Sequence, residues 1–314
     1  MKGLELSERF YRAFGETMLN ERFAAVLPFL AVGLVGSGSE CFGFDDEISQ
    51  DHDFEPGFCL FLPDEDLVDS RTEFALERAY AKLPMEFMGY KRSVLSPVGG
   101  NRHGVIRMAD FFEQKTGDKN AEIPLEAWFY IEEQFLAEAT SGKLFLDNFG
   151  KMTQLREKLA YLPEDVRLKK LGGQVLLMAQ AGQYNYARCV SRGERAAAQL
   201  AMGEFVNASL KVIFLLNKRY MPYYKWTFRA LKELPILSEL YGDLEYLISS
   251  GNTPSEFLQK SERVENICAV VAKELRRQSL SAVEANELER HAYAVNGKIK
   301  DATVRNRHIL YAVR

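Results

Sequence analysis

The segment from Gly36 to Phe54 holds residues whose types and spacing could do chemistry. It reads GSGSECFGFDDEISQDHDF, so a glycine-serine turn precedes Asp51 and Asp53, which open an apolar run. Side chains on a strand alternate between faces, so both carboxylates are expected on one face, about 7 Å apart. Carboxylate oxygens are ligands that Mg²⁺ prefers. Two such ions about 3.5–4 Å apart can hold the attacking and leaving oxygens of a phosphoryl transfer.

The turn at Gly36 and Ser37 supplies the second half of such a site. Glycine lets the backbone approach a phosphate closely. The serine hydroxyl and neighbouring amides can donate hydrogen bonds to phosphate oxygens, above all if a helix starts there. The pair therefore indicates a place for a phosphate group.

Three other phosphate or metal motifs do not fit this segment. Phe44 occupies the lysine position of a Walker-type loop that would start at Gly38. Cys41 stands where a dinucleotide fingerprint needs its third small residue. A calcium loop starting at Asp45 would have Gln50 at its turn glycine.

The elements that must position these residues follow from the apolar pattern. Residues 31–35 read as a buried strand that ends at Gly36, and a second strand begins near Asp51 and continues to Leu62. A later strand is expected over residues 103–108. Helices are expected over residues 6–29, beside the first strand, and over residues 64–83.

The second half of the chain reads as helical. From Met152 onwards strand signals disappear, and Gly, Pro, Asn and Ser separate helical stretches. We therefore predict an α+β fold with two domains, a small mixed-sheet domain over residues 1–150 and an all-helical domain over residues 151–314. Six helices are expected in the second domain, over residues 163–190, 194–216, 222–234, 236–249, 254–277 and 282–296.

Charge divides the chain at the same place. Residues 151–314 contain 26 Lys and Arg against 17 Asp and Glu, whereas residues 1–150 contain 14 against 27. A basic second half would suit a triphosphate or an anionic acceptor, although a solvated surface explains the same charges. The overall net charge of −4 argues against broad nucleic-acid binding but allows a local basic groove.

Gly36-Ser37, a spacer and Asp51-His52-Asp53 resemble the nucleotidyltransferase superfamily, which includes DNA polymerase beta and kanamycin nucleotidyltransferase. Together with the segments GQYN at residues 182–185 and YMPYYKW at residues 220–226, the chain looks closest to a bacterial family of that superfamily catalogued as a domain of unknown function. The resemblance implies that Asp51 and Asp53 bind Mg²⁺ and that Gly36 and Ser37 contact the triphosphate of an NTP.

The superfamily usually adds a third carboxylate from a later strand, as a metal ligand or as the base for the attacking hydroxyl. Residues 103–108 contain no acid, and Arg107 lies within them. Asp110 directly follows the strand and is the first candidate. Glu113 and Glu126 are the alternatives, and each could equally be a helix-start acid or a surface charge.

Two segments of the helical half could contact the nucleotide. Arg188 and Arg192 share a helix face, and a neighbouring helix could bring Lys225 close to them. We expect Arg192 and Lys225 to bind the phosphates, because guanidinium forks match phosphate oxygens and lysine acts as a point charge. Three aromatic side chains could stack on a base or complete the core: Tyr184, Tyr224 and Trp226.

The expected function is a Mg²⁺-dependent nucleotidyltransferase that moves NMP from an NTP such as ATP to an acceptor hydroxyl and releases pyrophosphate. The acceptor is a small molecule, RNA or a protein. The alternative is a catalytically weak nucleotide-binding sensor or a protein-interaction module.

The composition also indicates which cofactors and which cellular location to expect. Four cysteines lack Cys-X-X-Cys spacing, so neither zinc nor a disulfide framework is expected. With no apolar run of about 18 residues and no basic-then-apolar leader, we expect a cytoplasmic protein without a membrane partner.

Overall fold

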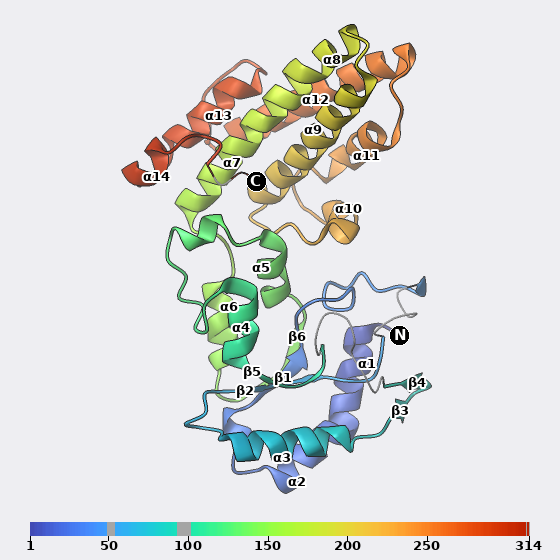
Figure 1. Cartoon of the computed structure of the whole chain (residues 1–314), viewed down its shortest axis with the longest axis vertical. Helices are drawn as coiled ribbons and strands as arrows, with labels where there is room; N and C mark the ends of the chain where they lie inside the picture. Colours follow the sequence, from blue (N-terminus) through green and yellow to red (C-terminus); the bar gives the residue numbers. More distant parts are fainter. Residues whose placement is uncertain (49–53, 93–101, 312, 314) are drawn as a thin grey trace. The chain divides into compact units, whose positions relative to one another are not determined.

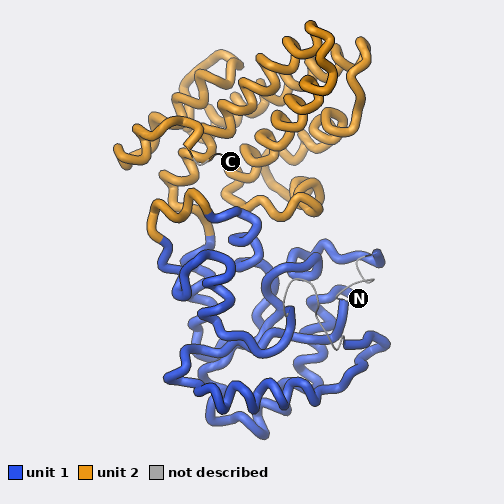
Figure 2. The backbone as a smooth tube through the Cα atoms, viewed as in Figure 1, with its two compact units in different colours: residues 1–123, 131–160 blue, residues 124–130, 161–314 orange. Residues whose placement is uncertain are grey.

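The computed structural model has an α+β fold, which confirms the predicted class. It describes residues 1–48, 54–92, 102–311 and 313. The chain forms two compact units, shown in Figure 2. Unit 1 comprises residues 1–123 and 131–160, and unit 2 comprises residues 124–130 and 161–314.

Unit 1 is built on a four-stranded mixed sheet in the order β5-β2-β1-β6. The central strand β1 is antiparallel to β2 and β6, whereas β2 and β5 are parallel. Gly33 pairs with Cys59, which pairs in turn with Gly104. The end of β1 and the starts of β2 and β5 therefore meet at one edge of the sheet. The strands are β1 (Ala31–Leu34), β2 (Cys59–Leu62), β5 (Gly104–Arg107) and β6 (Lys143–Asp147), and a separate hairpin consists of β3 (Glu86–Phe87) and β4 (Tyr90–Lys91).

Helices cover both faces of this sheet (Figure 1). Val32, Leu60 and Leu62 belong to a buried cluster with the helices α1 to α3. Phe61 points the other way because strand side chains alternate, and its ring lies 5.4 Å from that of Phe111 in α4. The helices of unit 1 are α1 (Gly3–Phe10), α2 (Glu16–Arg22), α3 (Ser70–Ala81), α4 (Met108–Thr116), α5 (Glu133–Thr140) and α6 (Lys151–Lys158), and a π-helical turn (Tyr11–Gly15) joins α1 to α2.

The second strand differs from the one expected from the sequence. It begins at Cys59, and residues 54–58 are not part of a strand. Pro56 has no N–H to donate to a ladder, and the N–H of Phe58 donates instead to the Tyr80 hydroxyl at 2.9 Å. The prediction of one strand from Asp51 to Leu62 is therefore wrong. Asp51 and Asp53 lie outside the described residues.

The other expected strands agree better with the structure. The strand expected over residues 103–108 corresponds to β5. The sequence pattern did not predict β6, a five-residue strand. The helix expected over residues 6–29 ends at Arg22 and is followed by a short 3-10 turn (Leu27–Phe29).

Unit 2 is helical, as expected, with α7 packed against both α9 and α13. The long helix α12 has the bounds that the sequence predicted, and Thr253 and Glu256 form a capping box at its start. Of the helices described, α9 is the one long and apolar enough to cross a membrane, and most of its apolar window is buried inside the unit. The helices are α7 (Glu164–Met178), α8 (Ala187–Ser191), α9 (Arg195–Leu216), α10 (Tyr224–Lys232), α11 (Tyr241–Ser249), α12 (Pro254–Arg277), α13 (Leu288–Gly297) and α14 (Ala302–Asn306).

Candidate functional site

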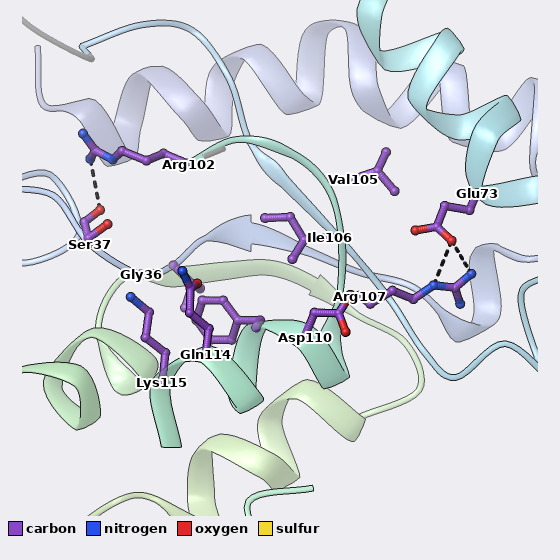
Figure 3. Close-up of a pocket in the computed structure, with 12 residues that line it drawn as sticks. Gly36, Ser37, Glu73, Arg102, Val105, Ile106, Arg107, Asp110, Gln114 and Lys115 are labelled. Carbon is purple, nitrogen blue, oxygen red and sulfur yellow. Dashed lines mark hydrogen bonds and ion pairs between the residues drawn. The ribbon is translucent and has the colours of Figure 1, made fainter. Parts of the chain in front are cut away.

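A cavity of about 350 Å³ opens in unit 1 beside the glycine-serine turn. Gly36 and Ser37 line it from the end of β1, and Arg102 lines it from the loop before β5. The helix α4 presents Asp110 and Lys115 along another side, with Gln114 between them (Figure 3). Three residues singled out in the sequence, Gly36, Ser37 and Asp110, thus line one cavity.

The turn that borders this cavity is fixed by its glycines and by contacts from distant segments. Gly36 and Gly38 have φ values of +119° and +121°, which side chains rarely adopt. A Cβ atom at Gly38 would overlap the Arg102 guanidinium. The Ser141 hydroxyl donates to the Gly36 carbonyl at 2.9 Å. No helix begins here, in contrast to the arrangement that would favour phosphate binding most strongly.

The donors of the turn are available to a ligand. Within the described ranges, neither the Ser37 hydroxyl nor the backbone amides of Ser37 and Gly38 donate a hydrogen bond. The Ser37 carbonyl, by contrast, accepts from Arg102 Nη2 at 3.0 Å. Successive amides in a turn of this kind can surround an anion. The turn therefore offers donors while its carbonyls are engaged elsewhere.

Arg107 lines the cavity, but its hydrogen bonds stabilise the fold. Its Nε and Nη2 donate to Glu73 Oε2 at 3.0 and 2.5 Å, and its Nη1 donates to the carbonyls of Pro63 and Val68 at 2.8 Å each. These bonds attach β5 to α3 and to the loop before it. Arg107 is thus committed to structure.

The other two cations of the lining are also paired. Arg102 forms an ion pair with Glu40, whose side chain is 8% exposed. Lys115 forms one with Glu138, and both side chains are mostly buried, at 11% and 13% exposed. The three cation–glutamate pairs cancel in charge, so the carboxylate of Asp110 remains uncompensated among the described residues of the cavity.

Asp110 is well placed to act on a ligand. It lies in the first turn of α4, is exposed, and forms no hydrogen bond or ion pair with another residue that the structure describes. The partial positive charge of a helix N-terminus stabilises a carboxylate there. Glu113, one turn on, is exposed and lies 3.7 Å from Lys119.

The third acid candidate, Glu126, belongs to unit 2 and is already bound. Arg307 Nη1 donates to it at 2.6 Å, and the Tyr311 hydroxyl donates as well. The hydrogen bond from Arg307, followed by that from Tyr311, lowers the pKa of the Glu126 carboxyl. Of the three acids, Asp110 alone lines the cavity.

The proposed metal ligands Asp51 and Asp53 lie outside the described residues. No group of three or more His, Cys, Asp or Glu that could hold a metal ion occurs within residues 1–48, 54–92 and 102–311.

The cations expected to bind the nucleotide in unit 2 do not come together. Arg192 directly follows α8 and Lys225 lies in α10, and Figure 1 shows these two helices at opposite ends of α9. Twenty-two residues of α helix span about 33 Å. One triphosphate does not reach both side chains. Of the nearby aromatics, Tyr184 and Tyr224 are exposed and Trp226 is half-buried.

The sequence reasoning did not identify Arg102, Gln114 and Lys115. A signal existed for Gln114, because it follows Asp110 by four residues and so lies on the same helix face. No local signal marked Arg102, since its partner Glu40 is 62 residues away.

Part of the chain matches a known protein family. A family model described as a domain of unknown function (DUF4037) matches residues 128–227. No curated protein matches the chain. The matched residues extend from the segment before α5 to the middle of α10 and do not include the glycine-serine turn or Asp110.

Proposed function

We propose that the chain is a Mg²⁺-dependent nucleotidyltransferase, which transfers NMP from an NTP to an acceptor hydroxyl. The observation that carries the proposal is the cavity of unit 1, where free donors of the turn and the uncompensated Asp110 line one space. Membership of the nucleotidyltransferase superfamily is part of the proposal, supported by the sequence pattern around Gly36, Asp51 and Asp53.

The residues of the cavity have different roles in the proposed transfer. The Ser37 hydroxyl and the amides of the turn bind phosphate oxygens. The acceptor oxygen forms a bond to the α-phosphorus while the bond from that phosphorus to the bridging oxygen breaks, and pyrophosphate leaves with the electron pair. Asp110 accepts the proton of the acceptor hydroxyl and later releases it to water.

The paired cations explain why such a site would need a metal. Glu40, Glu73 and Glu138 each bind a cation, so the described cavity has no surplus positive charge for a triphosphate. Asp51 and Asp53 would hold Mg²⁺, which leaves Asp110 to act as the base. When bound, Mg²⁺ would neutralise phosphate charge and stabilise the leaving oxygen.

One observation favours a second candidate, a catalytically weak nucleotide-binding sensor or protein-interaction module. The strand β5 carries no acid, and its Arg107 is fully engaged with α3 and the preceding loop. A third carboxylate on this strand is therefore absent, and Asp110 must replace it from α4.

Incubation of the purified chain with each labelled NTP and Mg²⁺ separates the two candidates. Pyrophosphate release, with transfer of label to the protein or to an added acceptor, supports the transferase. NTP binding measured by calorimetry without turnover, for every acceptor class tested, supports the sensor and contradicts the transferase.

A further inference from the structure

The segment of residues 217–232, which follows α9 and includes α10, has an unusual composition. It reads NKRYMPYYKWTFRALK and contains five Lys and Arg, five aromatic residues and no Asp or Glu. The proposed transfer in unit 1 uses none of these side chains. Basic residues interleaved with aromatics are typical of surfaces that bind nucleic acid.

The basic residues of helix α10 form a stripe of positive charge. Lys225, Arg229 and Lys232 follow one another at intervals of four and three residues, so they share one helix face, and all three are exposed. Thr227 and Leu231 face the core instead. The stripe extends for about 10 Å, which matches roughly three nucleotides of a stacked strand.

Aromatic side chains lie at the start of this stripe. Tyr224 is 73% exposed, and its ring centroid lies 4.3 Å from that of Tyr223, which is itself 38% exposed. An exposed tyrosine supported by a second ring presents a flat face at little entropic cost. Such faces stack on bases of any sequence.

The cations at the start of the segment are available to an anion. The side chains of Arg219 and Lys225 are exposed and form no ion pair with a residue that the structure describes. Lys218 is partly compensated, because its Nζ lies 3.7 Å from Glu164. Glu233 follows the stripe, so the positive charge is confined to residues 217–232.

A lipid surface is the alternative partner for a basic amphipathic helix. Membrane-binding helices insert aliphatic and aromatic side chains below the headgroups. The large apolar side chains that α10 and the preceding loop expose are Tyr223 and Tyr224, and Leu231 is fully buried. The segment therefore lacks the aliphatic face that a membrane requires.

We infer that residues 217–232 bind single-stranded nucleic acid, through backbone phosphates on the stripe and a base stacked on Tyr224. Together with the proposed function, on which this step rests, the inference means that the acceptor hydroxyl belongs to an RNA or DNA strand. The binding itself does not depend on transfer and can be measured without NTP.

Fluorescence anisotropy of labelled 12-nucleotide strands with the full chain tests the inference. Tyr224→Ala is expected to weaken binding by about fivefold or more, because stacking on one base is lost, while Tyr224→Phe retains it. Lys225→Ala is expected to reduce the slope of log K against log salt concentration by about 0.7, because one phosphate contact is lost. Tyr224→Ala should leave that slope unchanged.

Arg192→Ala is the matched control, since it removes an exposed cation at the opposite end of α9. It is expected to leave affinity and salt slope unchanged.

Equal affinity for RNA and DNA, or tighter binding of RNA through its 2′-hydroxyls, supports the inference. It is overturned if no strand binds, if a duplex binds as tightly, if Tyr224→Ala has no effect, or if Arg192→Ala lowers the slope as much as Lys225→Ala. Transfer to a small molecule without strand binding would reject this inference and leave the proposed function standing.

Discussion

Two groups of cations in this molecule look alike in sequence and differ in the structure. In unit 1, Arg102, Arg107 and Lys115 line a cavity, yet a glutamate neutralises each of them. In unit 2, Arg219 and Lys225 are exposed, and no ion pair to a described residue engages them. A cation can bind an anionic ligand only where no carboxylate of the protein already neutralises it. We therefore assign the cavity chemistry to donors and a carboxylate, and polyanion binding to α10.

Among the residues that the structure describes, the largest effect is expected at Asp110. Asp110→Asn should lower kcat by about 10²–10⁴-fold, the usual contribution of a positioned base, while NTP affinity and Tm stay unchanged. Single-turnover assays measure the rate, and calorimetry measures NTP affinity and Tm. Glu113→Gln, one turn further along the same exposed helix face, is the control and should retain full activity. If the Glu113 variant were slow and the Asp110 variant normal, the cavity would not hold the base.

The contrast between paired and unpaired cations predicts a difference in stability. Arg107→Ala leaves Glu73 partly buried without its partner and removes two bonds to backbone carbonyls, so it should lower the free energy of unfolding by about 3 kcal/mol. Arg219→Ala should change it by no more than about 0.5 kcal/mol. Urea unfolding of the two variants checks this, and equal losses would contradict the division of the cations.

A smaller effect is expected at the turn. Ser37→Ala should weaken NTP binding by about 1.5 kcal/mol, the lower value for a hydrogen bond to a charged group, with no change in Tm. Calorimetry measures the affinity. Ser39→Ala is the matched control, since the Ser39 hydroxyl already hydrogen-bonds to Glu40. Equal affinities for the two variants would show that the Ser37 hydroxyl does not contact the phosphates.

The smallest effect is expected at the exposed pair in unit 2. The hydrogen bond from Arg307 lowers the pKa of Glu126, so the pair stabilises the fold above the usual glutamate pKa of about 4.3. That stability is lost as the pH falls through the lowered pKa of the folded state. Tm measured against pH should show Glu126→Gln slightly below wild type at neutral pH and equal to it in strong acid. A gap that persists in acid would assign the effect to packing.

The sequence predicted elements whose signals are local. The helix α12 has the expected bounds because Thr253, Pro254 and Glu256 mark its start within four residues. The strand β5 was likewise found from its own apolar run. By contrast, β6 forms by pairing with β1, more than 100 residues earlier in the chain, and the break before β2 depends on Tyr80, more than twenty residues away. Long-range contacts of that kind leave no pattern in a single segment.

The candidate site shows the same division. Gly36 and Ser37 were picked out as a turn that follows one strand, and Asp110 as an acid that follows another. The end of β1 lies beside the start of β5 and not beside its end, so the strand order alone did not predict that these residues line one cavity. The pairs Arg102–Glu40 and Arg107–Glu73 join residues 62 and 34 positions apart. In the sequence these arginines contributed only to the net charge of residues 1–150, whereas in the structure their ion pairs stabilise the fold. Arg192 and Lys225 were grouped by type, and the length of α9 separates them.

The central claim is tested most directly by turnover of labelled NTP with Mg²⁺ in the wild type, Asp51→Asn, Asp53→Asn and the double variant. Residues that act as a unit are not additive, so each single variant should abolish transfer and the double variant should lose little more. Far-UV circular dichroism should show an unchanged fold in all four. Wild-type transfer activity and Mg²⁺-dependent NTP affinity in both single variants would contradict the assignment of these aspartates and, with it, the proposed nucleotidyltransferase.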